Sequence, residues 1–323
     1  MSKKLHEEHK ELMHYTNASG LYGIVTSKTL WASHTSFMND TEEVVGFSNR
    51  VLPKILRQEF ERHVGKSEDF AAKVEDARQL GIDFIEIEVK KLIEAFKEAE
   101  KAQDHYVSSF CTTKDEWIFQ NGLLSQWRGY GLDGGYTIVF DAARLHSLLT
   151  VEHEKYYEES LLLADVQYGM ARFPEVKDEQ ISEHIKRLTT WAHTRLSRSA
   201  TNAENEEAAE SNSVLSILCK HRGFEEEKEV RIVVSEPSAK IGPDPLNQSG
   251  KPYRKVKSYP RNGVPVPCVH LFEDQKLVAL PIQRVIVGPH PEKLDRKSAV
   301  EILLRNHNID AEVLASDTPF RGK

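Results

Sequence analysis

The chain is poor in cysteine, and its few cysteines are not spaced as metal ligands or crosslinks. Its 323 residues include only three, Cys111, Cys219 and Cys268, which are odd in number and far apart. No Cys-x-x-Cys pair occurs, which argues against a zinc knuckle and against a disulfide framework. Because unpaired thiols are typical of a reducing compartment, the sequence predicts a cytoplasmic protein.

Long apolar runs are also missing. No stretch approaches the roughly 18 consecutive apolar residues that a membrane span needs, and the opening residues MSKKLHEE lack the apolar core of a secretory signal. We therefore expect no membrane partner. The net charge is −7 and 39% of residues are hydrophobic. The chain can bury a good core, but no overall positive field would attract nucleic acid, so a polyanion site would have to be local.

The motifs of several large enzyme classes are absent. There is no P-loop, no Gly-x-Ser-x-Gly elbow and no His-Glu-x-x-His zinc motif, and the glycines at 129–135 lack the spacing of a dinucleotide-binding turn. His34, His221, His270 and His290 are isolated in the sequence, and no closely spaced Asp/His set appears. The sequence therefore predicts no metal site.

The apolar pattern predicts short strands separated by two helical insertions. The insertions are residues 42–103 and 176–222, where apolar residues recur at helical spacing among many Glu and Lys. Strand-like segments lie at 12–16, 29–33, 106–111, 135–140, 162–168, 229–234, 277–281, 284–289 and 312–315, with a turn at 38–40, a long loop or irregular hairpin at 237–267 and a helix at 297–306. This favours one α+β domain over residues 1–323, with a mixed, mostly antiparallel sheet.

The segment His14-Tyr15-Thr16 is polar where a core strand would be apolar. A strand that gives up packing for an imidazole and two hydroxyls indicates either a function or a locally satisfied structural histidine. Alternation sends His14 and Thr16 to one face and Tyr15 to the other. We expect His14 to donate to a ribose hydroxyl or a carboxamide, whereas Tyr15 stacks on an aromatic ring or packs in the core.

A second departure is the block of charge that enters the strand at 229–234. Glu227, Glu229 and Arg231 share one face because they are two residues apart. This face is either an ordinary solvated sheet face or one wall of a cleft in which an arginine holds a carboxylate. Such a carboxylate accepts a hydrogen bond from a ribose and stabilises positive charge on a sugar carbon. We expect this segment to face His14 across one cleft.

Two further segments combine polar, basic and aromatic residues. In Ser125–Gly131, the planar fork of Arg128 suits a phosphate, although a buried Trp127 beside an acid-paired Arg128 is the plainer interpretation. The second segment has basic residues interleaved with tyrosines, a pattern that grips single-stranded nucleic acid, although it also fits a solvated loop. Its predicted nucleic-acid-binding residues are Lys251, Tyr253, Arg254, Lys255, Lys257 and Arg261.

Taken in order, these segments resemble the bacterial family labelled domain of unknown function 2971. The label carries no activity. The resembling pieces run through most of the chain: His14–Thr16, Gly20–Ser33, Phe37–Asp40, Ser108–Cys111, Leu124–Gly131, Phe224–Arg231 and Ile286–Pro289.

The order of motifs is more distantly similar to that of ADP-ribosyltransferases, which use NAD as cofactor. That resemblance implies that His14 holds a ribose, that Tyr15, Tyr22 or Tyr130 stacks on nicotinamide, and that Glu229 contacts the nicotinamide ribose. The chain departs from the family by having Tyr15 where glycine is usual and Ser108-Ser109-Phe110 in place of Ser-Thr-Ser. The implied NAD-binding residues are His14, Tyr15, Thr16, Tyr22, Ser109, Gln126, Arg128 and Tyr130.

The expected function is that of an NAD-dependent ADP-ribosyltransferase that modifies a macromolecule, with nucleic acid as one candidate target. Glu229, His14 and Arg231 would be catalytic, and Arg128 or Arg231 would hold the pyrophosphate. The resemblance suggests a toxin or antiviral-defence role, with an antitoxin or regulatory protein as partner. Two alternatives remain open: an NAD hydrolase using the same cleft, and a non-enzymatic nucleic-acid-binding module.

Overall fold

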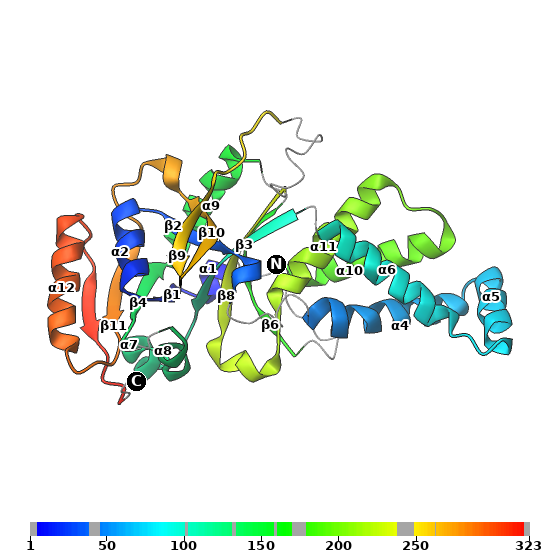
Figure 1. Cartoon of the computed structure of the whole chain (residues 1–323), viewed down its shortest axis with the longest axis horizontal. Helices are drawn as coiled ribbons and strands as arrows, with labels where there is room; N and C mark the ends of the chain where they lie inside the picture. Colours follow the sequence, from blue (N-terminus) through cyan, green and yellow to red (C-terminus); the bar gives the residue numbers. More distant parts are fainter. Residues whose placement is uncertain are drawn as a thin grey trace.

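The fold is α+β, as the sequence predicts, with one large and mostly antiparallel sheet. The computed structural model describes residues 5–38, 46–100, 103–130, 134–157, 160–169, 179–237, 249–261 and 263–319. The predicted turn at Asn39–Asp40 lies outside these ranges. Figure 1 shows the sheet with its covering helices on one side of the molecule and a lobe of helices on the other.

The sheet runs in the order β12-β11-β4-β1-β3-β2-β10-β9, with β8 on the second edge of β3 and β5 on β8. Among the described strands of this sheet, every pair is antiparallel except β11 with β12. The strands are β1 (Glu11–Thr16), β2 (Leu30–His34), β3 (Gln103–Cys111), β4 (Tyr136–Asp141), β5 (Ser160–Asp165), β8 (Glu229–Pro237), β9 (Val256–Arg261), β10 (Val264–Leu271), β11 (Ile282–Val287) and β12 (Glu312–Ala315).

The edge of β3 opposite β8 is shared between two strands. Strand β1 pairs with β3 only at Met13↔Cys111, whereas β2 pairs with it at Ser33↔Val107 and His34↔Tyr106. The sheet therefore divides along this edge: β1 continues toward β4, and β2 continues toward β10. Residues 108–110 of β3 lie between the two points of pairing.

Helices cover both faces of the sheet. Apolar residues of α2 (Ala18–Ser27), α9 (Ala142–Lys155) and α12 (Lys293–Asn306) belong to the main core, which includes Phe110, Val230 and Ile232 from the sheet. Helix α8 (Leu124–Tyr130), which follows α7 (Glu116–Asn121), packs Trp127 into a smaller core on the opposite face, with Met13, Tyr15 and Cys111. Short α1 (Leu5–Glu8) precedes β1.

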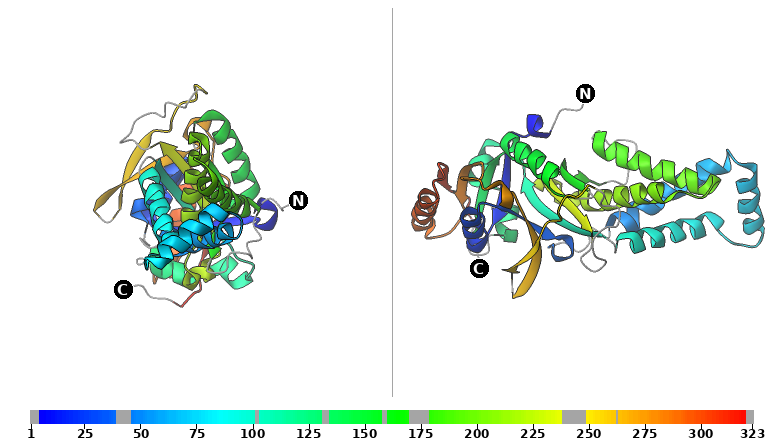
Figure 2. Two further views of the ribbon diagram at one scale, coloured as in Figure 1. Left: turned by 90° about the vertical axis from the view of Figure 1, so that its right-hand side faces the viewer. Right: turned by 90° about the horizontal axis from the view of Figure 1, so that it is seen from above.

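The two helical insertions form one lobe. Helices α4 (Leu52–Val64), α5 (Glu68–Gln79) and α6 (Phe84–Glu100) come from the first, and α10 (Glu179–Ser197) and α11 (Asn202–Leu218) from the second. Their buried side chains belong to one cluster that also contains Val107, Ala164 and Val233 of the sheet. Figure 2 shows that the lobe projects away from the sheet as a long arm.

Most predicted elements are present, but the strand predicted at 277–281 is not. The backbone amide of Ile282 donates to the carbonyl of Leu280 (2.8 Å), and the Pro281 carbonyl accepts from Asp141. This tight turn precedes β11, because proline has no amide with which to continue a ladder. The predicted hairpin at 237–267 is partly described, as β9 and β10. No helix in the described part of the chain is long and apolar enough to cross a membrane.

Candidate functional site

Glu229 is the centre of a buried ion-pair cluster at the start of β8. Arg231 donates from Nε to one carboxylate oxygen (2.7 Å) and from Nη2 to the other (2.9 Å). The Nζ of Lys220 donates to Glu229 (3.0 Å) and to Glu227 (2.8 Å). The exposed fraction is 4% for Glu229 and 0% for Arg231. The two hydrogen bonds from Arg231 and the one from Lys220 therefore hold the carboxylate in one orientation, almost entirely shielded from solvent.

The backbone of Glu229 is held as firmly as its side chain. Its amide donates to the hydroxyl of Tyr168 (2.8 Å), and its carbonyl accepts from the amide of Val166 (2.9 Å). The short segment after β5 therefore forms hydrogen bonds with both the backbone amide and the backbone carbonyl of Glu229.

The cluster keeps Glu229 ionised. Burial alone would raise the pKa of the carboxyl group, but the positive charge and hydrogen bonds of Arg231, the charge of Lys220 and a hydrogen bond from the Ser109 hydroxyl lower it to about 2. Desolvation of its hydroxyl, followed by the nearby charge of Glu229, raises the pKa of Tyr130 to about 12, although 42% of this residue is exposed. Burial, followed by the same charge, raises the pKa of the Cys111 thiol well above its usual value. At neutral pH the site holds one fixed anion beside a neutral phenol and a neutral thiol.

His14 approaches the same region from the point where β1 and β3 separate. Its Nδ1 lies 2.9 Å from the carbonyl oxygen of Ser109, and its ring lies 5.7 Å from that of Phe110. Burial lowers the pKa of the imidazole, opposed in part by this hydrogen bond. A carbonyl only accepts, so Nδ1 carries the proton and Nε2 keeps its lone pair. His14 is therefore built to accept a hydrogen bond at Nε2, whereas the sequence suggested a donor.

His14 and Glu229 meet at Ser109, but from opposite faces of the sheet. Glu229 is in register with Cys111, and Cys111 is in register with Met13, so these three side chains share a face. His14, one residue after Met13, points to the other face, where Phe110 lies. The two remote segments are thus neighbours through one serine, but they do not face each other across one cleft, and that prediction from the sequence is wrong. A ligand touching both would have to lie across the division in the sheet.

Other predicted NAD-binding residues take varied positions. Tyr15 packs in the core: its hydroxyl accepts from the amide of Leu123 (2.7 Å) and its ring meets the edge of Trp127.

Tyr22 is 61% exposed on α2 and Tyr130 is 42% exposed on α8. In α8, Arg128 is exposed and Gln126 is buried, while Thr16 ends β1. Arg231 has no exposed surface, which argues against its predicted contact with a pyrophosphate.

The predicted nucleic-acid segment divides into an anchor and an open strand. Arg254 is buried and bonds Glu152 (3.2 Å) and Glu236 (2.7 Å), so it holds the segment to the body and presents no charge to a ligand.

The Nζ of Lys251 donates to the His153 carbonyl (3.0 Å). The ring of Tyr253 meets the edge of Tyr157, and Lys255 is exposed. Beyond this anchor, alternation along β9 places Lys257, Tyr259 and Arg261 on one face.

An aromatic surface that the sequence analysis missed lies on that face. The rings of Trp31 and His270 stack with centroids 5.1 Å apart and planes 11° apart, and Tyr259 lies 5.3 Å from Trp31. The Tyr259 hydroxyl is 2.9 Å from that of Ser33. The signal was present in the alternation of Leu30-Trp31-Ala32-Ser33, which turns the indole away from the core. We call Trp31, His270, Tyr259, Lys257 and Arg261 the aromatic platform.

The aromatic platform lies on the same sheet face as Glu229. Trp31 and Ser33 share a face of β2, and Ser33 is in register with Val107. Val107 and Ser109 share a face of β3, and Ser109 is in register with Arg231. The basic and aromatic side chains therefore occupy one side of the sheet together with the buried anion.

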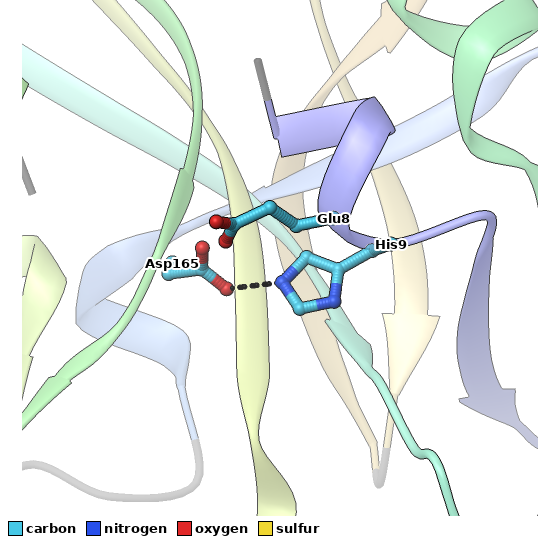
Figure 3. Close-up of side chains that lie close together, drawn as sticks. All are labelled: Glu8, His9 and Asp165. Atoms are coloured by element: carbon cyan, nitrogen blue, oxygen red, sulfur yellow. Dashed lines mark hydrogen bonds and ion pairs between the residues drawn. The ribbon is translucent and has the colours of Figure 1, made fainter. Parts of the chain in front are cut away.

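A second chemical group lies near the amino end of the described chain. Glu8, His9 and Asp165 each offer a potential metal-ligand atom, and these three atoms lie within 4.8 Å of one another. The Nε2 of His9 is 2.9 Å from a carboxylate oxygen of Asp165. Figure 3 shows the Glu8 and Asp165 carboxylates side by side with the imidazole directed at Asp165. Sequence spacing could not reveal this group, because Asp165 is remote from the other two.

The described part of the molecule also has an open pocket of about 550 Å³. It lies between α9, the turn before β11 and the end of α12, and Leu148, Leu277, Leu280 and Ile309 are among its lining residues. None of the predicted site residues lines it.

The comparisons with known proteins support the family resemblance. Residues 126–232 match the model of a family described as protein of unknown function (DUF2971). The matched region contains Arg128, Tyr130, Lys220 and the Glu229–Arg231 pair, so the resemblance to DUF2971 predicted from the sequence is confirmed there. Neither the curated proteins nor the solved structures contain a match to the chain.

Proposed function

We propose that the protein is an NAD-dependent ADP-ribosyltransferase that modifies single-stranded nucleic acid. The observation that carries the proposal is the junction at Ser109. Its carbonyl accepts from the His14 imidazole at 2.9 Å, and its hydroxyl helps to lower the pKa of the Glu229 carboxyl group. Three residues to which the ADP-ribosyltransferase resemblance points, on strands remote in sequence, therefore adjoin at Ser109, with His14 and Glu229 on opposite faces of the sheet.

The chemistry of these groups fits the donor end of the reaction. NAD would supply an ADP-ribose group whose bond to nicotinamide breaks as positive charge develops on a ribose carbon. Glu229, ionised and fixed by Arg231 and Lys220, is an anion that needs no reorientation to stabilise such charge. The unprotonated Nε2 of His14 can accept from a ribose hydroxyl, and exposed Arg128 can bind phosphate.

The aromatic platform supports nucleic acid as the acceptor. Stacked rings bind unpaired bases without regard to sequence, and basic residues beside them attract the phosphate chain. Arg261 supplies such charge, and so does Lys257, whose ammonium is also paired with Glu273, on a protein whose net charge is −7. Because the platform shares a sheet face with Glu229, a bound strand would be delivered to the side of the sheet that holds the anion.

Labelled NAD and purified protein test the proposal directly. We expect label on single-stranded RNA or DNA, and loss of that label in Glu229→Gln. Glu227→Gln is a matched control, because Glu227 lies two residues before Glu229 and also bonds Lys220 (2.8 Å). Folding of each variant is checked by circular dichroism and thermal unfolding, and Glu229→Asp serves as a second probe that keeps the charge.

Each alternative gives a distinct result. Free ADP-ribose without labelled polymer would show a hydrolase. Label on protein alone would refute the proposed acceptor and leave the transferase. Binding of single strands without any release of nicotinamide would overturn the enzyme proposal in favour of a binding module, and so would equal nicotinamide release by wild type and a folded Glu229→Gln variant.

A further inference from the structure

Glu8, His9 and Asp165 bring one imidazole nitrogen and two carboxylate oxygens together at the junction of α1, β1 and β5. Asp165 is partly buried, with 31% of its side chain exposed, and His9 retains 17%. Figure 3 shows the two carboxylates close together with the imidazole beside them. Two like charges at short range repel, and a cation between them would replace repulsion with attraction.

We propose that these three side chains bind a divalent transition-metal ion of the zinc type. A mixed nitrogen and oxygen donor set suits Zn²⁺, whereas Mg²⁺ prefers oxygen ligands and keeps much of its water. In the structure the Nε2 of His9 faces Asp165 at hydrogen-bond distance. Metal binding moves the ring proton from Nε2 to Nδ1, so that Nε2 and both carboxylates offer lone pairs to the ion. Three protein ligands leave further positions for water.

The location gives the site a consequence for Glu229. Asp165 is in register with Val230, and the next residue, Val166, donates its amide to the Glu229 carbonyl at 2.9 Å. Three residues beyond Asp165, the Tyr168 hydroxyl accepts from the Glu229 amide. An ion that fixes Asp165 therefore stiffens the segment that grips the backbone of Glu229, and the inference does not depend on which reaction Glu229 serves.

Titration of the untagged full chain with ZnCl₂, followed by calorimetry, tests the site. We expect one bound Zn²⁺ per chain, and little response to MgCl₂. Loss of an outer-shell partner already costs about 10- to 100-fold in metal affinity, so His9→Ala and Asp165→Asn should cost at least as much. His34→Ala is the matched control. His34 and Asp104 form a similar pair (3.3 Å), and in the described residues that pair does not belong to a three-donor group.

Hydrogen exchange gives a second, local measurement. Zn²⁺ should slow exchange of the Val166 and Glu229 amides in wild type and leave it unchanged in His9→Ala, whose fold is verified without metal. Absence of Zn²⁺ binding by wild type would overturn the proposal. Undiminished Zn²⁺ binding by both folded site variants would overturn it as well, since the ion would then be held elsewhere. Equal binding of Mg²⁺ and Zn²⁺ would refute the proposed donor preference.

Discussion

Arg231 presents two nitrogens to the two oxygens of Glu229, a residue only two positions earlier on the same strand. Side chains at this spacing point in the same direction, so the pair forms without any help from strand pairing. Such proximity is ordinary on an exposed sheet face. Here both residues are buried, and the ion pair therefore matters to folding as well as to any chemistry.

Removal of one partner should destabilise the protein strongly. Glu229→Gln leaves the Arg231 charge buried without its counter-ion, and we expect a loss of about 3–5 kcal/mol in the free energy of unfolding. The double variant Glu229→Leu/Arg231→Met should recover most of that loss, because it removes both charges. Urea unfolding measures the cycle, and a Glu229→Gln variant as stable as wild type would contradict the buried ion pair.

Acid should weaken the fold through Glu229 in a defined window. The pKa of its carboxyl is about 2 in the folded chain against an ordinary 4.5. The folded state therefore prefers the ionised form, and the resulting stability is complete above about pH 4.5 and declines as the pH falls toward 2. Unfolding free energies measured across this range should fall more steeply for wild type than for Glu229→Gln.

Protonation of His105 should weaken the fold in a separate window at higher pH. Burial lowers the pKa of this imidazole, which bonds Ser235, to about 4 from 6.5. The folded state prefers the neutral ring, so its contribution is complete above about pH 6.5 and is lost as the pH falls toward 4. His105→Gln should flatten the stability profile in that interval. Between pH 7 and 8 the two slopes should coincide.

Single-strand binding should depend on Trp31. Stacking contributes about 1–3 kcal/mol per base, so Trp31→Ala should weaken affinity for an oligonucleotide by about that amount. Lys257→Ala with Arg261→Ala should instead lower the salt dependence of binding. Trp117, 56% exposed on α7, supplies the control Trp117→Ala. Fluorescence anisotropy at several salt concentrations distinguishes these effects. Equal losses of affinity in Trp31→Ala and Trp117→Ala would contradict a role for the aromatic platform in binding.

The helical lobe offers a test of local stability. Thr201 caps α11 in a reciprocal arrangement with Glu204, in which each side chain bonds the backbone amide of the other residue. Thr201→Ala should cost about 1 kcal/mol, as loss of such a cap usually does. Thr190→Ala, at an exposed position inside α10, should be neutral or slightly stabilising, because alanine favours helices. Thermal unfolding of the two variants measures the difference.

The sequence revealed local features more readily than spatial ones. The strands at 12–16, 106–111 and 229–234 are visible in their alternation, and the charge pattern marked Glu229 and Arg231. The burial of Arg254 was hidden, because its partners Glu152 and Glu236 are remote in sequence. Contacts such as His14 with Ser109 depend on strand order, which a one-dimensional pattern does not specify.

The shared core of the two insertions has a consequence for biosynthesis. Helices α4 to α6 leave the ribosome well before α10 and α11, which cover part of their apolar surface. Until the later pair arrives, Leu56, Phe60 and Phe96 have no complete neighbour set and are open to unwanted association. A nascent chain halted between residues 100 and 179 would therefore carry helices with exposed apolar surface that are prone to aggregate. We expect chaperone binding to be strongest during this interval of synthesis.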